Sequence, residues 1–274
     1  MKSNRVIYFL GGGNMAEAII KAIQHSYSSL NIIVIEKSAD RREYLKKTYP
    51  SVTIKSVLTD PLCSEDVLFI AVKPQDTLKA VKDLELKSPL VVSMVAGLPI
   101  TALSQGLNGL QRIIRMMPNT PVSALEGMYG FYANEHQVSS DDKEWLENLL
   151  TNSGQFIWVE KEDDLHYVTA ISGSGPAYVF YFMNALFEAA KHLGLDDQAS
   201  KLLVEQTVLG GVKLAQSSFF SFQELQEKVT SPRGTTYEAI KVFDSHDLKE
   251  IILRGVVACA NRSKELSSEL ELVT

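Results

Sequence analysis

The feature that most constrains the fold of this chain is a glycine-rich turn between an apolar run and an amphipathic stretch. Residues 6–10 are apolar, and Gly11-Gly12-Gly13-Asn14-Met15-Ala16 follows them directly. A G-x-G-x-x-A turn joining a strand to a helix is typical of dinucleotide-binding sheets, because its glycines let the backbone turn tightly and approach a pyrophosphate. The predicted cofactor-binding residues of this turn are Gly11, Gly13, Asn14 and Met15.

Short apolar runs alternate with amphipathic stretches through about the first 160 residues. The predicted strands are residues 6–10, 32–35, 67–72, 90–95, 112–115, 128–133 and 156–159. The predicted helices between them include residues 16–25, 40–47, 77–84, 100–107 and 141–150. Such alternation predicts an α/β fold, a doubly wound and mostly parallel sheet with helices on both faces.

Long helical patterns replace the strands after about residue 160. The predicted helices are residues 178–192, 197–217, 221–229, 236–245 and 247–266. The first begins with an aromatic run, residues 178–182, that is apolar on nearly every face. A helix of this kind must be enclosed on all sides, and burial against a second subunit would achieve that. We therefore predict a sheet domain over residues 1–160 and a helical domain over residues 161–274.

An acidic residue stands where a dinucleotide-binding sheet needs one. Glu36 ends the second predicted strand, 20 residues after Ala16, where a carboxylate can bind the adenosine ribose. Its charge favours NADH, because a carboxylate repels the 2′-phosphate of NADPH. Cationic and polar residues that could hold that phosphate follow at once: Lys37, Ser38, Arg41 and Arg42. The sequence leaves the choice between NADH and NADPH open, with Glu36, Lys37 and Ser38 as predicted contacts.

Polar turns follow three further predicted strands. Since ligands of doubly wound sheets bind at the carboxyl ends of strands, these turns are predicted to border the cofactor. Asn119, in a loop stiffened by prolines on either side, could place an amide near the nicotinamide. The predicted contacts in these turns are Val72, Lys73, Pro74, Ala96, Gly97 and Asn119.

Two polar segments of the helical part are further candidates. Ser174 lies between glycines, but a hydrolase nucleophile elbow needs glycine two residues to either side, where Ser172 and Pro176 stand. Glycines and serines at a helix start instead favour backbone approach to a ligand. Residues 229–236 form a turn in which Pro232 and Gly234 end one helix and two threonines begin the next.

Five motifs occur in an order that resembles pyrroline-5-carboxylate reductases. They are the Gly11 turn, Val72-Lys73-Pro74, residues 115–121, residues 172–178 and residues 231–236. The resemblance covers nearly the whole chain. It implies a Rossmann-type domain followed by a helical dimerisation and substrate domain, self-association as a dimer or larger oligomer, and reduction of 1-pyrroline-5-carboxylate to L-proline with NADPH or NADH.

The resemblance also implies individual roles. The substrate carboxylate would be held by the loop residues Ser231, Arg233, Gly234 and Thr235. The Thr236 hydroxyl would hydrogen-bond the ring nitrogen, which makes Thr236 the predicted catalytic residue. Glu162 would lie near the substrate, and Ser172 and Ser174 near the nicotinamide.

This chain departs from the family pattern at two positions. Arg233 stands where the family usually has glycine, and His166 stands where aspartate is common. Arg233 could strengthen carboxylate binding by a charge-assisted contact or point to solvent. If position 233 needs a positive φ, the arginine is strained there.

The composition excludes several functions. The net charge of −6 and the lack of a long basic block argue against nucleic acid as a partner. No apolar run approaches the roughly 20 residues of a membrane span. The five histidines never pair at metal-ligand spacing, so we predict no metal site, and the two separated cysteines favour a reducing cytoplasm. Two alternatives stay open: reduction of another small cyclic imine, and a nucleotide-binding protein without turnover.

Overall fold

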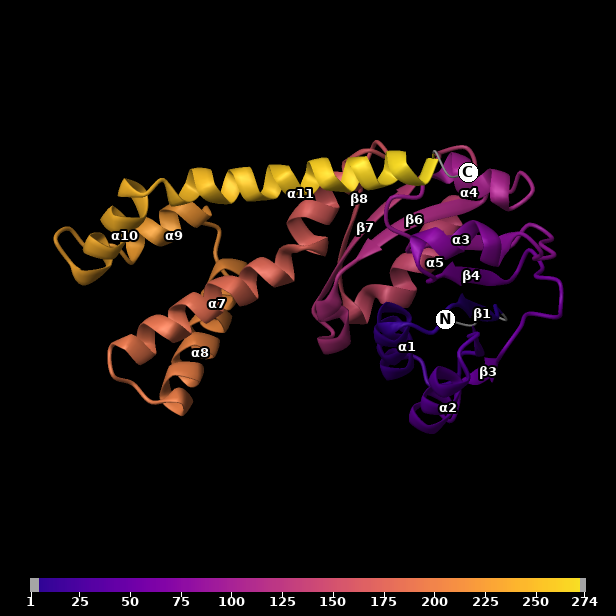
Figure 1. Cartoon of the computed structure of the whole chain (residues 1–274), viewed down its shortest axis with the longest axis horizontal. Helices are drawn as coiled ribbons and strands as arrows, with labels where there is room; N and C mark the ends of the chain where they lie inside the picture. The colour runs from indigo at the N-terminus through magenta and orange to yellow at the C-terminus, as the bar shows by residue number, and fades with distance from the viewer. Residues whose placement is uncertain (1–4, 272–274) are drawn as a thin grey trace. The chain divides into compact units, whose positions relative to one another are not determined.

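The computed structural model describes residues 5–271 and contains one eight-stranded sheet (Figure 1). The strand order is β3-β2-β1-β4-β5-β6-β7-β8, and every pairing is parallel except that of β6 with β7. The strands are β1 (Ile7–Leu10), β2 (Ile32–Ile35), β3 (Thr53–Lys55), β4 (Val67–Ile70), β5 (Leu90–Ser93), β6 (Ile113–Pro118), β7 (Gly127–Ala133) and β8 (Gly154–Trp158). This is the doubly wound order predicted for a dinucleotide-binding sheet.

Eleven α-helices accompany the sheet among the described residues. They are α1 (Asn14–Ser26), α2 (Ala39–Thr48), α3 (Pro74–Val81), α4 (Ile100–Gly106), α5 (Ser140–Leu150), α6 (Asp164–Val168), α7 (Gly175–His192), α8 (Asp197–Gln216), α9 (Phe222–Lys228), α10 (Thr235–Ser245) and α11 (Leu248–Glu271). A π-helix, Thr169–Gly173, follows α6 directly. Within residues 5–271, none of the helices is long and apolar enough to cross a membrane.

The central strands are apolar on both faces because helices cover the sheet on both sides. In β1, Ile7 and Phe9 belong to the core formed with α1 and α5, whereas Tyr8 and Leu10 belong to the core formed with α3 and α4. Phe9 stacks on Phe69 of β4 with ring centroids 4.8 Å apart. Alternation of side chains along each strand therefore fills two separate cores.

The sequence located most strands and helices and missed several short elements, among them two 3₁₀-helices, Thr120–Ala124 and Thr151–Ser153. The short edge strand β3 was not predicted, because Thr53-Ile54-Lys55 carries too little apolar pattern to stand out. The turn formed by α6 and the π-helix was also missed. Helix α3 begins at Pro74 rather than residue 77, since proline is well tolerated in the first turn of a helix.

The described residues divide into two compact units. The first contains residues up to Ser174 together with those from Cys259 onward, and the second contains residues 175–258. Helix α11 therefore contributes its first part to the second unit and its last part to the first. The functional domains 1–160 and 161–274 stay a prediction, since compactness places the divisions elsewhere.

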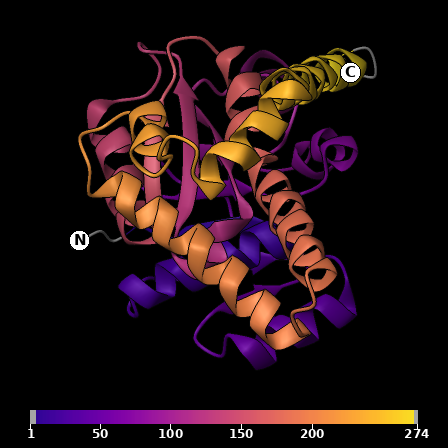
Figure 2. The same ribbon diagram turned by 90° about the vertical axis from the view of Figure 1, so that its left-hand side faces the viewer.

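The second unit is helical and has little core of its own. Helices α7 and α8 form a hairpin (Figure 2), and α7 has no buried residue. Its aromatic run is exposed in the single chain, with Phe180 at 64% and Tyr181 at 82% exposure. An apolar surface of this extent requires a covering partner.

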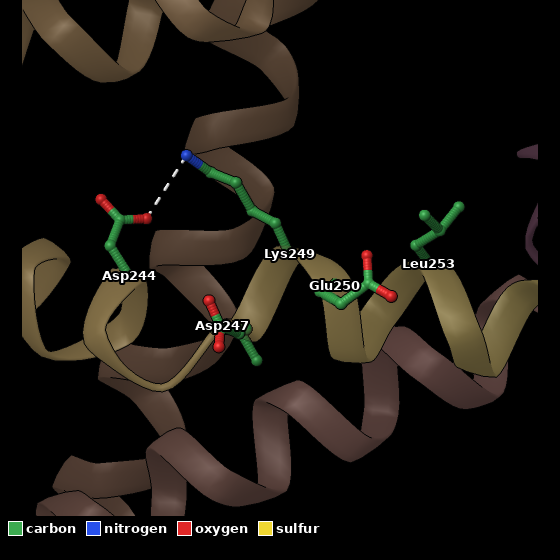
Figure 3. A pocket seen from close by; sticks show the side chains of 6 residues that line it. Asp244, Asp247, Lys249, Glu250 and Leu253 are labelled. Carbon is green, nitrogen blue, oxygen red and sulfur yellow. Dashed lines mark ion pairs between the residues drawn. The ribbon is translucent and has the colours of Figure 1, made fainter.

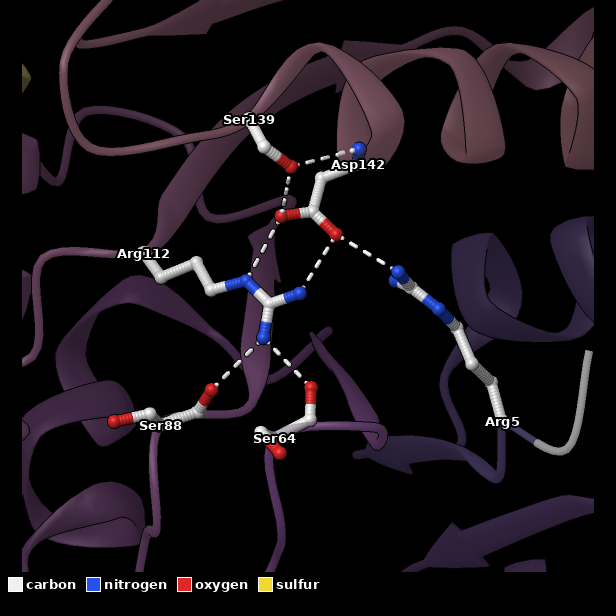
Figure 4. Close-up of polar contacts among 6 residues, drawn as sticks. All are labelled: Arg5, Ser64, Ser88, Arg112, Ser139 and Asp142. Carbon is white, nitrogen blue, oxygen red and sulfur yellow. Dashed lines mark hydrogen bonds and ion pairs between the residues drawn. The ribbon is translucent and has the colours of Figure 1, made fainter.

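A buried carboxylate joins the amino ends of several strands in the first unit (Figure 4). Asp142 on α5 accepts two hydrogen bonds from Arg112, at 2.8 and 2.7 Å, and one from Arg5 at 2.9 Å. Arg112 also donates to the carbonyl oxygens of Ser64 and Ser88, which precede β4 and β5. One acid thus ties the segments that enter β1, β4, β5 and β6.

These partners set the titration of Asp142. Burial alone would raise its pKa, but hydrogen bonds from Arg112, Arg5 and Ser139 outweigh burial and lower the pKa from 3.8 to about 2. A carboxyl whose pKa is depressed in the folded state stabilises that state above its unfolded pKa. A shift of this size corresponds to roughly 2 kcal/mol at neutral pH, lost as pH falls from about 4 towards 2.

We predict that Asp142→Asn lowers the free energy of unfolding at pH 7 by about 2–4 kcal/mol, because two arginines lose their counter-charge. Asp141→Asn is the matched control, an exposed acid one residue earlier whose change should stay within about 0.5 kcal/mol. Urea unfolding at several pH values measures both. The deficit of Asp142→Asn should shrink as pH approaches 2, and a deficit that is constant with pH would contradict this explanation.

Candidate functional site

The Gly11 turn lies where the strand order of the sheet reverses, between β1 and β4. A doubly wound sheet opens a crevice at the carboxyl ends of the strands at this point. Gly11 has φ +98°, and a Cβ there would lie 2.8 Å from the carbonyl oxygen of Ala71 and 3.0 Å from Cγ1 of Val72. The turn and the end of β4 therefore pack so closely that only glycine fits.

Helix α1 starts from this turn with an open N-terminus. Gly13 is its extended N-cap residue, and no side chain among residues 5–271 caps the first turn. Gly13 and Asn14 are exposed and Met15 is half-buried. Free N–H groups at a helix start can receive a pyrophosphate.

The Glu36 carboxylate is tied to the same turn. Its Oε2 accepts a hydrogen bond from the Gly12 N–H at 2.9 Å, and its Oε1 accepts one from the Ser38 N–H at 2.8 Å. Ser38 also caps α2 through the N–H of Arg41. The acid at the end of β2 thus lies beside the glycine turn, as a ribose-binding acid should.

The three cationic side chains near Glu36 differ in how many hydrogen bonds and ion pairs they make within the protein. Arg41 pairs with Glu17 and donates from Nε to the Gly12 carbonyl at 2.6 Å. Arg42 donates to the carbonyl oxygens of Glu36 and Lys37, at 3.0 and 2.7 Å. The Lys37 side chain is 84% exposed and pairs loosely with Asp76, at 3.8 Å.

The turns after β4 and β5 complete this edge of the sheet. Lys73 is exposed, and its carbonyl accepts a hydrogen bond from the Thr77 hydroxyl in the first turn of α3. Ala96 is exposed, whereas Gly97 is buried and has φ +76°. Ala96 is thus open to a ligand, and Gly97 is held by the protein.

Asn119 connects the end of β6 to the π-helix. Its amide nitrogen donates to the Ser172 carbonyl at 3.1 Å, and its amide oxygen accepts from the Met128 N–H at 2.9 Å. The side chain is buried. The predicted amide therefore organises the segment that carries Ser172.

The π-helix shapes the approach to α7. π-helical turns are frequent at functional sites because they locally displace the backbone from regular α-helical geometry. The Ser172 hydroxyl donates to the Val168 carbonyl, and the Ser174 hydroxyl accepts a weak hydrogen bond from the Cys259 thiol at 3.3 Å. Both serines are half-buried.

Glu162 is held by two donors. Its Oε1 accepts from the Ile100 N–H at 2.7 Å and from Arg115 at 2.9 Å. Arg115 is a buried residue of β6. Glu162 therefore differs from the solvent-exposed acids near it in sequence, because its carboxylate is bonded within the protein. It also holds the N–H of Ile100 at the start of α4.

His166 departs from the usual aspartate and is buried. Its Nδ1 lies 2.8 Å from the Ser263 hydroxyl on α11. Burial, with the charge of Arg115 next, lowers the pKa of His166. The neutral imidazole is thus favoured at this position.

The predicted substrate loop lies in the second unit, between α9 and α10. Thr235 is the first residue of α10, and Gly234 is its N-cap. No side chain among the described residues caps this helix, so its first N–H groups are left for another acceptor. Arg233 is exposed and has φ 61°. Position 233 therefore does have the positive φ that the usual glycine suggested, and a residue with a Cβ is strained there.

The first unit brings the predicted cofactor residues to one edge of the sheet and its flanking turns. Those at the carboxyl ends of the strands are Gly11, Gly13, Asn14, Met15, Glu36, Lys37, Ser38, Val72, Lys73, Pro74, Ala96, Gly97 and Asn119. Ser172 joins them through Asn119, and Glu162 belongs to the same unit. The predicted site residues that lie in the second unit are Ser231, Arg233, Gly234, Thr235 and Thr236.

A hollow in the second unit contains none of these residues. It lies at the turn between α10 and α11 and is lined by Asp244, Asp247, Leu248, Lys249, Glu250 and Leu253 (Figure 3). Lys249 is paired with Asp244 at 3.4 Å. The remaining carboxylates make this hollow unsuited to an anionic substrate. Within the described part of the chain, no group of three or more His, Cys, Asp or Glu side chains is placed to hold a metal ion.

Comparisons with known proteins agree with the geometry. Residues 162–266 match the family described as "Pyrroline-5-carboxylate reductase dimerisation", and residues 6–97 match "NADP oxidoreductase coenzyme F420-dependent". The chain is 35% identical to a pyrroline-5-carboxylate reductase of Pasteurella multocida over 95% of this chain and 97% of that protein. The chain belongs to the pyrroline-5-carboxylate reductase family.

Solved structures of the family share the fold. A pyrroline-5-carboxylate reductase from Coxiella burnetii has a TM-score of 0.86 and 38% identity, covering 97% of this chain and 99% of that one. A Plasmodium falciparum pyrroline carboxylate reductase with NADP bound has a TM-score of 0.83 and 28% identity, with the same coverage. These findings confirm the predicted Rossmann-type fold with a helical dimerisation region, and the prediction of an NAD(P)H-dependent oxidoreductase.

The sequence missed several residues that organise the site. Gly12 holds Glu36 through its backbone, Arg115 holds Glu162, and Ser263 and Ser267 of α11 bond His166 and Gly97 within the first unit. A buried arginine in an apolar strand was a signal for Arg115. The two serines lie in an ordinary amphipathic helix, where nothing in the pattern marks them.

We predict that Arg233→Gly raises the free energy of unfolding by about 0.5–1 kcal/mol, because glycine adopts a positive φ without the clash of a Cβ. Arg233→Ala is the control, since it removes the guanidinium and keeps the Cβ, and it should change stability by less than about 0.5 kcal/mol. Thermal and urea unfolding measure both variants. Equal effects of the two substitutions would show that strain at residue 233 is unimportant.

Proposed function

We propose that this protein reduces 1-pyrroline-5-carboxylate to L-proline with NADPH or NADH, as a cytoplasmic enzyme of proline biosynthesis that works as a dimer or larger oligomer. Support for the reaction comes from the family membership over the full chain. The observation that carries the residue assignments is the uncapped start of α10 in a loop rich in hydroxyls. Support for self-association comes from the match to a dimerisation family and from the exposed aromatic run on α7.

The reaction needs little acid–base catalysis from the protein. The nicotinamide supplies a hydride to the imine carbon, and the ring nitrogen carries a proton in the iminium form, so the product is the secondary amine. An iminium is already electrophilic, and rate enhancement can come from holding the two reactants in position. The protein must therefore fix the substrate carboxylate and the ring nitrogen.

The start of α10 suits the carboxylate. Its free N–H groups carry the positive end of the helix dipole, and the neighbouring residues 231–235 add hydroxyls and the Arg233 guanidinium. Arg233 is exposed, so it can reach a carboxylate or solvent. We assign Ser231, Arg233, Gly234 and Thr235 to the carboxylate site, with Glu162 as a further substrate residue.

Thr236 is assigned to the ring nitrogen. It lies in the first turn of α10, is half-buried, and makes no side-chain hydrogen bond to another described residue. A hydroxyl in that state can donate to or accept from a ligand, which suits a group that orients the ring N–H.

We predict that wild-type protein oxidises NADPH or NADH only when 1-pyrroline-5-carboxylate is present, and that Thr236→Ala lowers kcat/KM by about 100-fold through loss of a hydrogen bond made in the transition state. Thr236→Ser keeps the hydroxyl and should retain activity to within about tenfold. Absorbance at the nicotinamide band measures the rates.

A six-membered cyclic imine is the discriminating second substrate. The proposal requires a higher kcat/KM for the five-membered ring. A higher value for the six-membered ring would favour the alternative imine reductase, and no oxidation with any imine would contradict the enzyme assignment.

We predict that Glu36→Gln shifts the ratio of dinucleotide affinities towards NADPH by about tenfold, because it removes a charge that repels the 2′-phosphate and keeps the side-chain length. Glu43→Gln, an exposed acid on α2, is the matched control. Direct titration of each variant with NADH and NADPH measures the four dissociation constants. An unchanged ratio in Glu36→Gln would place the ribose away from this carboxylate.

A further inference from the structure

The turn between β5 and α4 is held at both of its ends by residues far away in the sequence. At one end, the Ser267 hydroxyl of α11 donates to the Gly97 carbonyl at 2.6 Å. At the other end, the Ile100 N–H donates to Glu162. Between these anchors the turn has no regular structure, so its backbone depends on both.

The contact at Gly97 is a close one between two backbones. Gly97 is buried with φ +76°, and a Cβ there would lie 3.4 Å from the backbone N and Cα of Ser267 and 3.3 Å from Cδ1 of Leu270. Helix α11 therefore lies directly on the glycine. The hydrogen bond fixes the orientation of the peptide unit that follows Gly97.

The same part of α11 makes other contacts within the first unit. Ser263 bonds the buried His166, Lys264 donates to the Tyr167 hydroxyl at 3.2 Å and lies over its ring, and Cys259 bonds Ser174. These contacts keep the helix in place without Ser267. Removing the Ser267 hydroxyl should therefore change the turn and leave the helix docked.

We propose that Ser267 is a positioning residue for the dinucleotide, acting through the backbone of the Ala96–Gly97 turn. The turn follows β5, the neighbour of β4, at the carboxyl edge where a doubly wound sheet binds its cofactor. Ala96 is exposed at this edge, whereas Gly97 is buried and bonded to Ser267. The inference rests on the proposed function in placing the cofactor at this edge. It gives the last turns of the C-terminal helix a part in cofactor binding.

The experiment compares two adjacent serines of the full-length protein. Ser267→Ala removes the hydrogen bond to Gly97, and Ser268→Ala is the matched control, because the exposed Ser268 hydroxyl donates to the Lys264 carbonyl of its own helix. Titration with NADPH and NADH gives dissociation constants without turnover. Initial rates then give KM for the dinucleotide and for the pyrroline.

The loss of one hydrogen bond should raise the dissociation constant and KM of the dinucleotide about 3–10-fold in Ser267→Ala. The KM for the pyrroline and the values of Ser268→Ala should stay within about twofold of wild type, and Ser267→Thr should restore dinucleotide binding. Equal binding by Ser267→Ala and wild type would overturn the proposal. Equal increases in KM for the dinucleotide and the pyrroline would also overturn it. A Ser267→Ala chain that fails to fold would overturn it as well, since the contact would then serve stability alone.

The outcome is separable from that of the proposed reaction. Wild-type protein that binds dinucleotide and reduces no imine would contradict the reaction, while the comparison of Ser267 with Ser268 would still test the positioning role. A protein that binds neither dinucleotide would contradict both.

Discussion

The arrangement of the candidate site depends on the reversal of strand order between β1 and β4. Parallel strands on either side of that point bring their carboxyl ends to one edge, so turns that are far apart in sequence become neighbours. Gly11 packs against the carbonyl of Ala71 and leaves no room for a side chain.

The helical unit obeys a different constraint. Helix α7 exposes aromatic side chains along its length because the second unit cannot cover them from within. Burial of apolar surface is the main favourable term in folding, so a helix of this composition is stable only against a partner. The match to a dimerisation family is consistent with such a surface, because a second subunit can cover it.

Much of the fold was predictable because its signals are local. Apolar runs of strand length, a glycine turn and helix caps each act over a few residues, so β1, β4, β5 and their helices were found from sequence. The polar three-residue β3 carries no such signal. Contacts of Ser267 with Gly97 and of Arg115 with Glu162 join residues separated by 170 and 47 positions, and only the folded chain brings them together.

The backbone at Arg233 shows the limit of local prediction. The family pattern indicates glycine at that position, and the observed φ of 61° explains the preference. The sequence indicated that a positive φ was possible at position 233, and only the structure showed that the backbone adopts one. An arginine at a strained position needs a compensating gain, and a cation next to an uncapped helix start is the kind of group that can provide one by binding an anion.

The amino ends of the strands carry a stabilising charge cluster, whereas the carboxyl ends carry the candidate site. At the amino edge, Asp142 pairs with Arg5 and Arg112 in a largely buried cluster that ties several strands together. At the carboxyl edge, Gly13, Asn14 and Lys73 are exposed, and the start of α1 is left uncapped. Exposed backbone N–H groups at that edge are bonded to water in the free protein and are therefore available to an anion such as a pyrophosphate. The hydrogen bonds of Asp142 and Arg112 join the segments that enter β1, β4, β5 and β6, so the strands that carry the candidate site are held together at the edge away from it, and the turns at the carboxyl edge can remain open to a ligand.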